Sequence, residues 1–199
     1  MNYADFKALY FLSCFTLAII ILSPTLAMVI QLPPGERFSE LWILGSSGMA
    51  ENYPLNVKTE EIYNMSLGVA NHMGSLQFFK LCVKFRNQTE PSPNTTTHTP
   101  SPIPSLYTYQ IFLRDGKYWE SPLAIAFSNV SFSENRSTIG HLIINDVAFS
   151  IDKSAVWDSK GNGYYYQLFV ELWTYDSESK TVQFHNRFVG IWLNITKTS

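Results

Sequence analysis

Cysteines and charged residues are both scarce in this sequence. Of its 199 residues only two are cysteine and 15% are charged, with a formal net charge of -2. Cys14 lies in a long apolar run and Cys82 in a candidate strand, so we expect no bridge between them, and a disulfide-stapled scaffold is excluded. Without a cluster of Lys and Arg, we also expect no nucleic-acid partner. An aromatic content of 15% argues against a disordered chain.

The N-terminal segment is apolar and uncharged. No charged residue lies between Lys7 and Glu36, and residues 8–32 are dominated by Leu, Ile, Ala, Phe, Val and Met. As a helix, this stretch exceeds the roughly 30 Å hydrocarbon layer of a bilayer. We therefore predict a transmembrane helix over 8–32 that contacts membrane lipid, a cytoplasmic N-terminus over 1–7 and a Pro- and Gly-containing linker over 33–37.

A cleaved signal peptide is the alternative interpretation of the same segment. Leu9 to Leu22 would form its apolar region, and small residues at Thr25 and Ala27 would allow cleavage after Ala27. The apolar run continues beyond Ala27, which favours an uncleaved anchor.

Six Asn-x-Ser/Thr sequons follow this segment and none precedes it. They begin at Asn64, Asn87, Asn94, Asn129, Asn135 and Asn194. Such tripeptides are N-glycosylation acceptors, so they indicate a single-pass cell-membrane protein whose C-terminal domain is extracytoplasmic. Asn, Ser and Thr also favour turns for their own reasons, which is the alternative explanation.

After Phe38 the sequence alternates with the period of β-strands. Phe79, Leu81, Val83 and Phe85 alternate with more polar residues, which predicts a strand with one buried and one solvated face. A further alternating pair of segments, 166–173 and 182–194, predicts a hairpin. The remaining candidate strands are 38–44, 62–70, 106–113, 123–132, 139–144 and 147–151.

Eight or nine short strands predict a mainly β domain over 38–196, followed by a short tail over 197–199. We expect an immunoglobulin-like antiparallel β-sandwich, with a closed barrel as the alternative. The pair Asn145-Asp146 predicts a two-residue turn. A change of phase in the last strand predicts a bulge near Asn186 and Arg187.

A Pro- and Thr-rich segment over 88–105 interrupts the strands. Proline removes backbone donors, so this segment cannot join a central sheet and is expected to be an extended surface loop. A stalk between two domains is the alternative, but the strands on both sides are needed for one core. We predict a single domain.

Catalytic and metal-binding motifs are weak. The four histidines are scattered, and residues 158–163 start like a calcium loop but carry Lys160 at a ligand position, so a turn is favoured. We expect no metal, no cofactor and no enzymatic activity. An envelope hydrolase using carboxylates such as Glu40, Asp158 and Glu171 is the least favoured hypothesis.

Aromatic residues are dense around the predicted hairpin. Trp157, Tyr165, Trp173 and Tyr175 are candidate ligand or interface residues, because alternation turns some of these rings outward. Cross-strand packing within the sheet is the alternative role.

Three segments resemble a known family. They are Glu40-Leu-Trp-Ile-Leu-Gly45, Gly48-Met-Ala-Glu-Asn-Tyr-Pro54 and Gly68-Val-Ala-Asn-His72. The chain resembles the C-terminal extracytoplasmic part of archaeal predicted membrane proteins of domain-of-unknown-function family sixteen-sixteen, from about Ala8 to Tyr63 and more loosely to Thr196. The resemblance implies an archaeal envelope protein, and the family supplies no catalytic residue.

These observations lead to a ranked set of functions. The leading hypothesis is a membrane-anchored β-sandwich with a structural, adhesive or interaction role at the cell envelope, where its partners are envelope proteins or glycans. The second is a carbohydrate- or protein-binding receptor that uses the exposed aromatics of the 164–175 strand.

Overall fold

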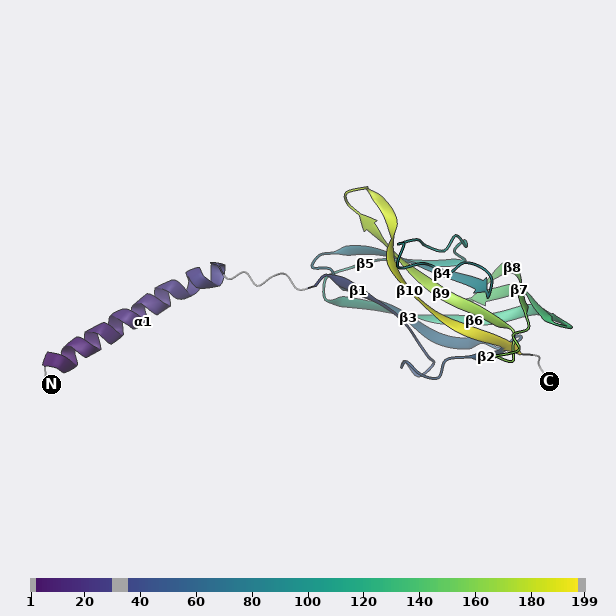
Figure 1. Cartoon of the computed structure of the whole chain (residues 1–199), viewed down its shortest axis with the longest axis horizontal. Helices are drawn as coiled ribbons and strands as arrows, with labels where there is room; N and C mark the ends of the chain where they lie inside the picture. The colour runs from purple at the N-terminus through teal and green to yellow at the C-terminus, as the bar shows by residue number, and fades with distance from the viewer. Residues whose placement is uncertain (1–2, 30–35, 197–199) are drawn as a thin grey trace. The chain divides into compact units, whose positions relative to one another are not determined.

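A computed structural model describes residues 3–29 and 36–196 of the chain. It divides into two units, Met1–Glu36 and Arg37–Ser199. Within the described residues, the first has one helix and the second has strands, turns and loops (Figure 1). Most of the expected linker, residues 33–35, and the expected tail over 197–199 lie outside the described residues.

The first unit is helix α1 (Tyr3–Val29). It starts five residues before the expected span, and the last expected residues, 30–32, lie outside the described part. Its internal hydroxyls bond to its own backbone: Ser13 Oγ donates to the Tyr10 carbonyl at 2.9 Å and Thr16 Oγ1 to the Leu12 carbonyl at 3.0 Å. Among the described residues, no helix meets both the length and the hydropathy needed to cross a membrane.

Residues 37–196 of the second unit form ten strands (Figure 1). In chain order they are β1 (Phe38–Leu44), β2 (Asn56–Lys58), β3 (Tyr63–His72), β4 (Gln77–Asn87), β5 (Tyr107–Leu113), β6 (Lys117–Ser133), β7 (Arg136–Ile144), β8 (Val147–Val156), β9 (Tyr165–Asp176) and β10 (Thr181–Thr196). The short strand β2 was not expected from the sequence.

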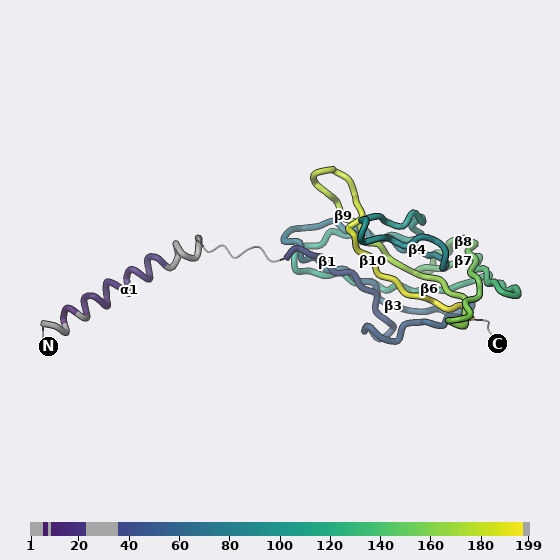
Figure 2. Tube along the Cα trace, in the orientation of Figure 1, coloured from purple at the N-terminus to yellow at the C-terminus, as the bar shows by residue number. Residues whose placement is uncertain are grey.

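The strands form two five-stranded sheets, in the orders β1-β3-β6-β7-β8 and β2-β10-β9-β4-β5. All neighbouring strands pair antiparallel except β2, which runs parallel to β10. The tube in Figure 2 shows the two sheets as layers, with the β9–β10 hairpin extending beyond them. The mainly β, two-sheet sandwich is therefore confirmed, and the closed barrel is wrong because the strands form two separate sheets.

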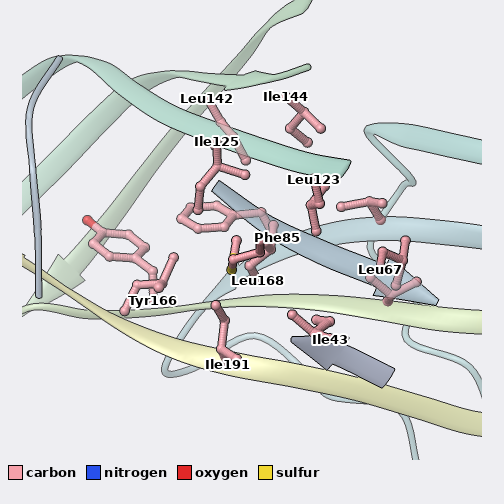
Figure 3. Close-up of a cluster of buried hydrophobic side chains, with 14 of the residues drawn as sticks. Ile43, Leu67, Phe85, Leu123, Ile125, Leu142, Ile144, Tyr166, Leu168 and Ile191 are labelled. Carbon is pink, nitrogen blue, oxygen red and sulfur yellow. The ribbon is translucent and has the colours of Figure 1, made fainter. Parts of the chain in front are cut away.

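Alternation along the strands fills the space between the sheets. The core includes Leu67 of β3, Phe85 of β4, Ile125 of β6 and Leu168 of β9, all at most 1% exposed (Figure 3). Tyr166 is fully buried among them, and its hydroxyl is satisfied by Ser137, whose Oγ lies 2.9 Å away. No disulfide crosses this core, because Cys82 is a free thiol.

Two local predictions about the backbone are confirmed. Asn145 and Asp146 have φ of 46° and 64°, the left-handed values that a tight two-residue turn between β7 and β8 requires. The register of β10 against β9 shifts between Phe184 and Arg187, and Asn186 in this bulge has a φ of 53°.

The outer face of β4 differs from the prediction. Lys84 and Cys82 point away from the core and were expected in solvent, yet they are only 4% and 3% exposed. The Pro- and Thr-rich segment over 88–105 folds back against this face and buries Pro93, Ser101 and Ile103 of its own. It is a surface loop, as expected, but it also serves as a cover for the second sheet.

A buried ion pair lies at the centre of this cover. Lys84 Nζ is 2.8 Å from Glu171 Oε2 of β9, and Lys84 also donates to the Ser101 carbonyl at 2.8 Å. The Ser101 N–H donates to Glu171 Oε1 at 2.7 Å, and Trp173 Nε1 donates to Glu171 Oε2 at 3.1 Å. Charges taken out of water are tolerated when they are paired and hydrogen-bonded in this way, so the loop completes the site that buries them.

Removing one member of this pair tests the role of the loop. In Lys84→Met, Glu171 loses its counter-charge and the Ser101 carbonyl loses its donor, so we expect a loss of about 3–5 kcal/mol of unfolding free energy. Urea denaturation measures this loss. Hydrogen exchange at the Ser101 amide should also accelerate, because the loop is held less firmly.

Lys80→Met is the matched control. Lys80 lies on the same outer face of β4 but is only partly buried. It should change stability by less than about 1 kcal/mol, as surface substitutions usually do. Equal losses for the two variants would contradict a specific role of the buried pair.

Candidate functional site

The four aromatic residues predicted from the hairpin do not form one surface. Tyr165 and Tyr175 lie near opposite ends of β9, about 33 Å apart at the usual rise per residue. Trp157 lies beside Tyr164, with ring centroids 5.0 Å apart, at the Tyr165 end. Trp157 and Tyr175 are 39% and 46% exposed. One ligand cannot contact both of these exposed rings.

The other two predicted aromatics are engaged within the domain. The Tyr165 hydroxyl donates to the Gly161 carbonyl at 2.5 Å and so closes the preceding turn. Trp173 donates to Glu171 and packs against Phe184, with ring centroids 6.1 Å apart. For these two residues the geometry fits the alternative role, packing within the sheet.

The sequons differ in accessibility. Asn64, Asn94, Asn129 and Asn135 are exposed, whereas Asn87 and Asn194 are half-buried. The side-chain amide of Asn87 donates to the Ser154 carbonyl at 2.9 Å, and that of Asn194 to Asn56 Oδ1 at 3.0 Å. The nitrogens that would carry a glycan at these two positions are therefore already in use.

A cavity of about 590 Å³ lies between the start of the 88–105 loop and β8. Several of its polar groups are engaged: Lys153 forms an ion pair with Glu90, and the backbone N–H of Asn87 donates to Glu90 Oε2 at 2.9 Å. Gln88 donates to the Val156 carbonyl at 3.2 Å. These contacts attach the loop to β8. The polar groups of this cavity therefore hold the loop in place.

A second hollow lies on the outer face of the first sheet. In the pairing register, Ala70 of β3 lies between Glu40 of β1 and Tyr118 of β6. Two residues earlier on the same face of β3, Gly68 lies between Trp42 and Glu120. The middle strand thus contributes small residues, and its two neighbours contribute large ones. We call this hollow the β3 trough; it measures about 400 Å³ and is lined by Glu40, Trp42, Ala70, His72, Gly116, Lys117, Tyr118 and Glu120.

The indole of Trp42 lies across Gly68. A Cβ at position 68 would collide with the Cε2, Cζ2 and Nε1 atoms of the ring. Glycine within a strand often marks such a close approach. Trp42 therefore has one side against the backbone of β3 and is only half-buried, because the other side borders the trough.

Polar groups surround the open part of the trough. His72 Nε2 lies 3.1 Å from Glu40 Oε1, and the His72 ring stacks on Phe38 with centroids 4.6 Å apart and planes at 25°. Tyr118 is 70% exposed on the opposite side. The trough combines two aromatic rings with hydrogen-bonding groups. Small-molecule sites usually have this combination of apolar and polar lining.

The chemistry-bearing residues named from the sequence do not converge. Glu40 lies on the outer face of the first sheet and Glu171 on the outer face of the second, so the sandwich separates them. Asp158 accepts the Lys160 N–H at 2.9 Å and belongs to a turn. In the described part of the chain, no three His, Cys, Asp or Glu side chains gather where they could hold a metal ion.

Two buried titratable groups lie outside the trough. Burial lowers the pKa of His185, which lies in the β10 bulge, and the positive charge of Arg187 lowers it further. Burial raises the pKa of the Cys82 thiol beneath the loop. Both shifts favour the neutral form, so these groups behave as packed residues of the domain.

Comparisons with known proteins identify no family. No family model matches the chain, and no curated protein matches it. The resemblance to an archaeal family therefore stays a prediction.

Some solved structures are weakly similar. The CARDB domain of a Pyrococcus furiosus protein, in complex with di-metal ions, has a TM-score of 0.41 and 9% identity, covering 83% of this chain and 94% of that one. A beta-glucosidase from Listeria innocua in complex with glucose has a TM-score of 0.40 and 7% identity, covering 80% of this chain but 16% of that one. Scores this low support no conclusion about function. The evidence for the sandwich is the pairing of its own strands into two sheets.

The trough was missed at the level of sequence because its residues come from three distant segments. A signal was nevertheless present. Gly68 and Ala70 are two small residues on one face of a strand, while Glu40 and Trp42, and Tyr118 and Glu120, alternate with apolar residues. Only the register of β1 and β6 against β3 brings these pairs together.

Gly68→Ala tests the contact between Trp42 and the floor of the trough. The added methyl group would displace the indole, so we expect a loss of about 1–3 kcal/mol, as for other overpacking substitutions. Denaturant unfolding measures the loss, and a red shift of tryptophan fluorescence reports the displaced ring.

A double-mutant cycle with Trp42→Leu separates this collision from a general intolerance of position 68. Because the smaller side chain removes the collision, the penalty of Gly68→Ala should shrink in the Trp42→Leu background. Equal penalties in both backgrounds would show that the contact with Trp42 is not the cause.

Proposed function

We propose that this chain is an extracytoplasmic interaction module of the cell envelope, exported by its N-terminal apolar segment. The β-sandwich carries the interaction, and its role is binding or adhesion, without catalysis. The observation that carries this proposal is the combination of an apolar helix with a sandwich that has its own core.

The helix supports export because its side chains are apolar on every side. Phe6, Leu9, Phe11 and Ile20 are all more than 60% exposed. The described part of this unit holds no second helix or strand that could cover these side chains, and a helix that is apolar all round is usually buried in protein or in lipid. The hydroxyls of Ser13 and Thr16 are satisfied within the helix, as a lipid environment demands.

The sandwich supports a role outside the cytoplasm. It has a continuous hydrophobic core of its own, so it can fold as a domain separate from the helix. Four of the six sequons are exposed. Exposure is what glycosylation of an exported domain requires.

Protease protection tests the topology. With an epitope tag after Ser199, we expect proteinase K to remove the tag from intact cells, because the sandwich lies outside. A cytoplasmic protein carrying the same tag is the control for membrane integrity. A tag that is cut only after lysis would overturn the proposed location.

Mass spectrometry of the mature protein then distinguishes an anchor from a cleaved leader. An N-terminus at Met28 would indicate cleavage after Ala27, whereas a chain that starts upstream of Ala8 and is extracted only by detergent would indicate an anchor. Recovery of the intact chain in the buffer-soluble fraction would contradict the membrane role of the segment.

Site-specific glycan mapping tests exposure to the glycosylation machinery. In a host that N-glycosylates exported proteins, we expect Asn64, Asn94 and Asn135 to be modified more fully than Asn87 and Asn194. The amides of the latter two donate to Ser154 and Asn56. Enzymatic deglycosylation in heavy-oxygen water followed by peptide mass spectrometry measures the occupancy.

Asn135→Gln provides the internal control, because Asn135 lies in the β6–β7 turn and away from the sheet faces. This variant should remove one glycan without changing stability. An exported protein with none of its sequons occupied would remove this line of support for the proposal.

A further inference from the structure

We propose that the β3 trough binds a neutral pyranose ring of a carbohydrate. This inference names a ligand class for a site on the sandwich. It goes beyond the proposed export and is tested independently of it.

The trough is narrow, and its sides are formed by two paired strands. β1 and β6 are the two neighbours of β3, so their backbones lie about 10 Å apart across the trough. Between them the floor consists of Ala70, with the indole of Trp42 over Gly68 next to it. The volume of about 400 Å³ lies within the usual range for small-ligand sites.

Two aromatic side chains, Trp42 and Tyr118, line the trough. Trp42 is fixed on Gly68, so its exposed side is a rigid, flat apolar surface. Tyr118 lies across β3 from Glu40 and is free to pack on a ligand, since it is 70% exposed. The C–H groups of one face of a pyranose ring pack well on such rings.

Hydrogen-bonding and charged residues surround the trough. Glu40 and Glu120 supply acceptors, and Lys117 lines the end of the trough. Glu40 is already within 3.1 Å of His72, which reduces its availability to a ligand cation. Charges of both signs are therefore present, and hydroxyl groups can use donors and acceptors together. This balance favours a neutral polyol over an organic cation.

Nuclear magnetic resonance on the full chain tests the proposal. The protein is held in polyoxyethylene detergent, which contains neither sugar nor quaternary ammonium. Asn64 lies on the same outer face of β3 as Gly68, so the Asn64→Gln variant is used to exclude a glycan next to the trough. The probes are the methyl glycosides of glucose, galactose, mannose and N-acetylglucosamine, and the signal is the indole N–H resonance of Trp42, assigned through Trp42→Phe.

We expect at least one glycoside to shift the Trp42 resonance saturably while leaving that of Trp157 unchanged. Tyr118→Ala and Glu120→Gln should each weaken the affinity about fivefold or more, because each removes one class of contact. Both side chains are exposed at the surface, so the variants are expected to fold. Tyr175→Ala, an exposed tyrosine on the second sheet, is the matched control and should leave the affinity unchanged.

Three results would overturn the inference. The first is the absence of a saturable shift with every glycoside. The second is tighter binding of tetramethylammonium than of any glycoside, which would identify a site for organic cations. The third is an affinity that responds to Tyr175→Ala and not to Tyr118→Ala, which would locate binding at the hairpin. None of these results bears on export, because protease protection measures export separately.

Discussion

The alternation of side chains along antiparallel strands is the constraint on which the rest of this domain depends. Each strand has two faces, and the side chains on the inner faces of both sheets form the core. The outer faces then have to be solvated or covered. The 88–105 loop covers the second sheet around Lys84 of β4 and Glu171 of β9, whereas the first sheet leaves its outer face open over β3. The two outer faces therefore differ in what they can offer a ligand.

The covered face shows why a Pro- and Thr-rich loop can be a fixed part of the domain. A loop interrupted by five prolines cannot extend the sheet. It nevertheless supplies the carbonyl and the amide of Ser101 to the Lys84–Glu171 pair, which on a bare sheet face would face water. Burial then strengthens each interaction in the network, since screening by solvent is reduced. The composition of this loop thus predicts irregular structure, but it does not predict mobility.

The sequence was sufficient to predict elements whose evidence is local. β4 follows from the alternation of Phe79, Leu81, Val83 and Phe85, and the turn after β7 follows from Asn145 and Asp146. The bulge in β10 follows from a change of phase along a single strand. β2, with three residues, is too short to show a period, and it exists because it pairs with the end of β10. The burial of Lys84 likewise depends on a partner that is distant in the chain.

The candidate site was harder to predict than the strands. Residues that follow one another along an extended strand lie far apart in space, so a cluster in the sequence is not a cluster in the structure. The aromatics between Trp157 and Tyr175 are neighbours in the sequence, yet a strand that rises about 3.3 Å per residue spreads them along its length. The trough is built the opposite way, from residues about 30 and 50 positions apart that the register aligns. A slip of one residue between β1 and β3 would turn Leu41 and Ile43 outward and Trp42 inward. The pairing that fills the core therefore also builds the trough, and a site held by three paired strands requires little reorganisation to receive a rigid ligand.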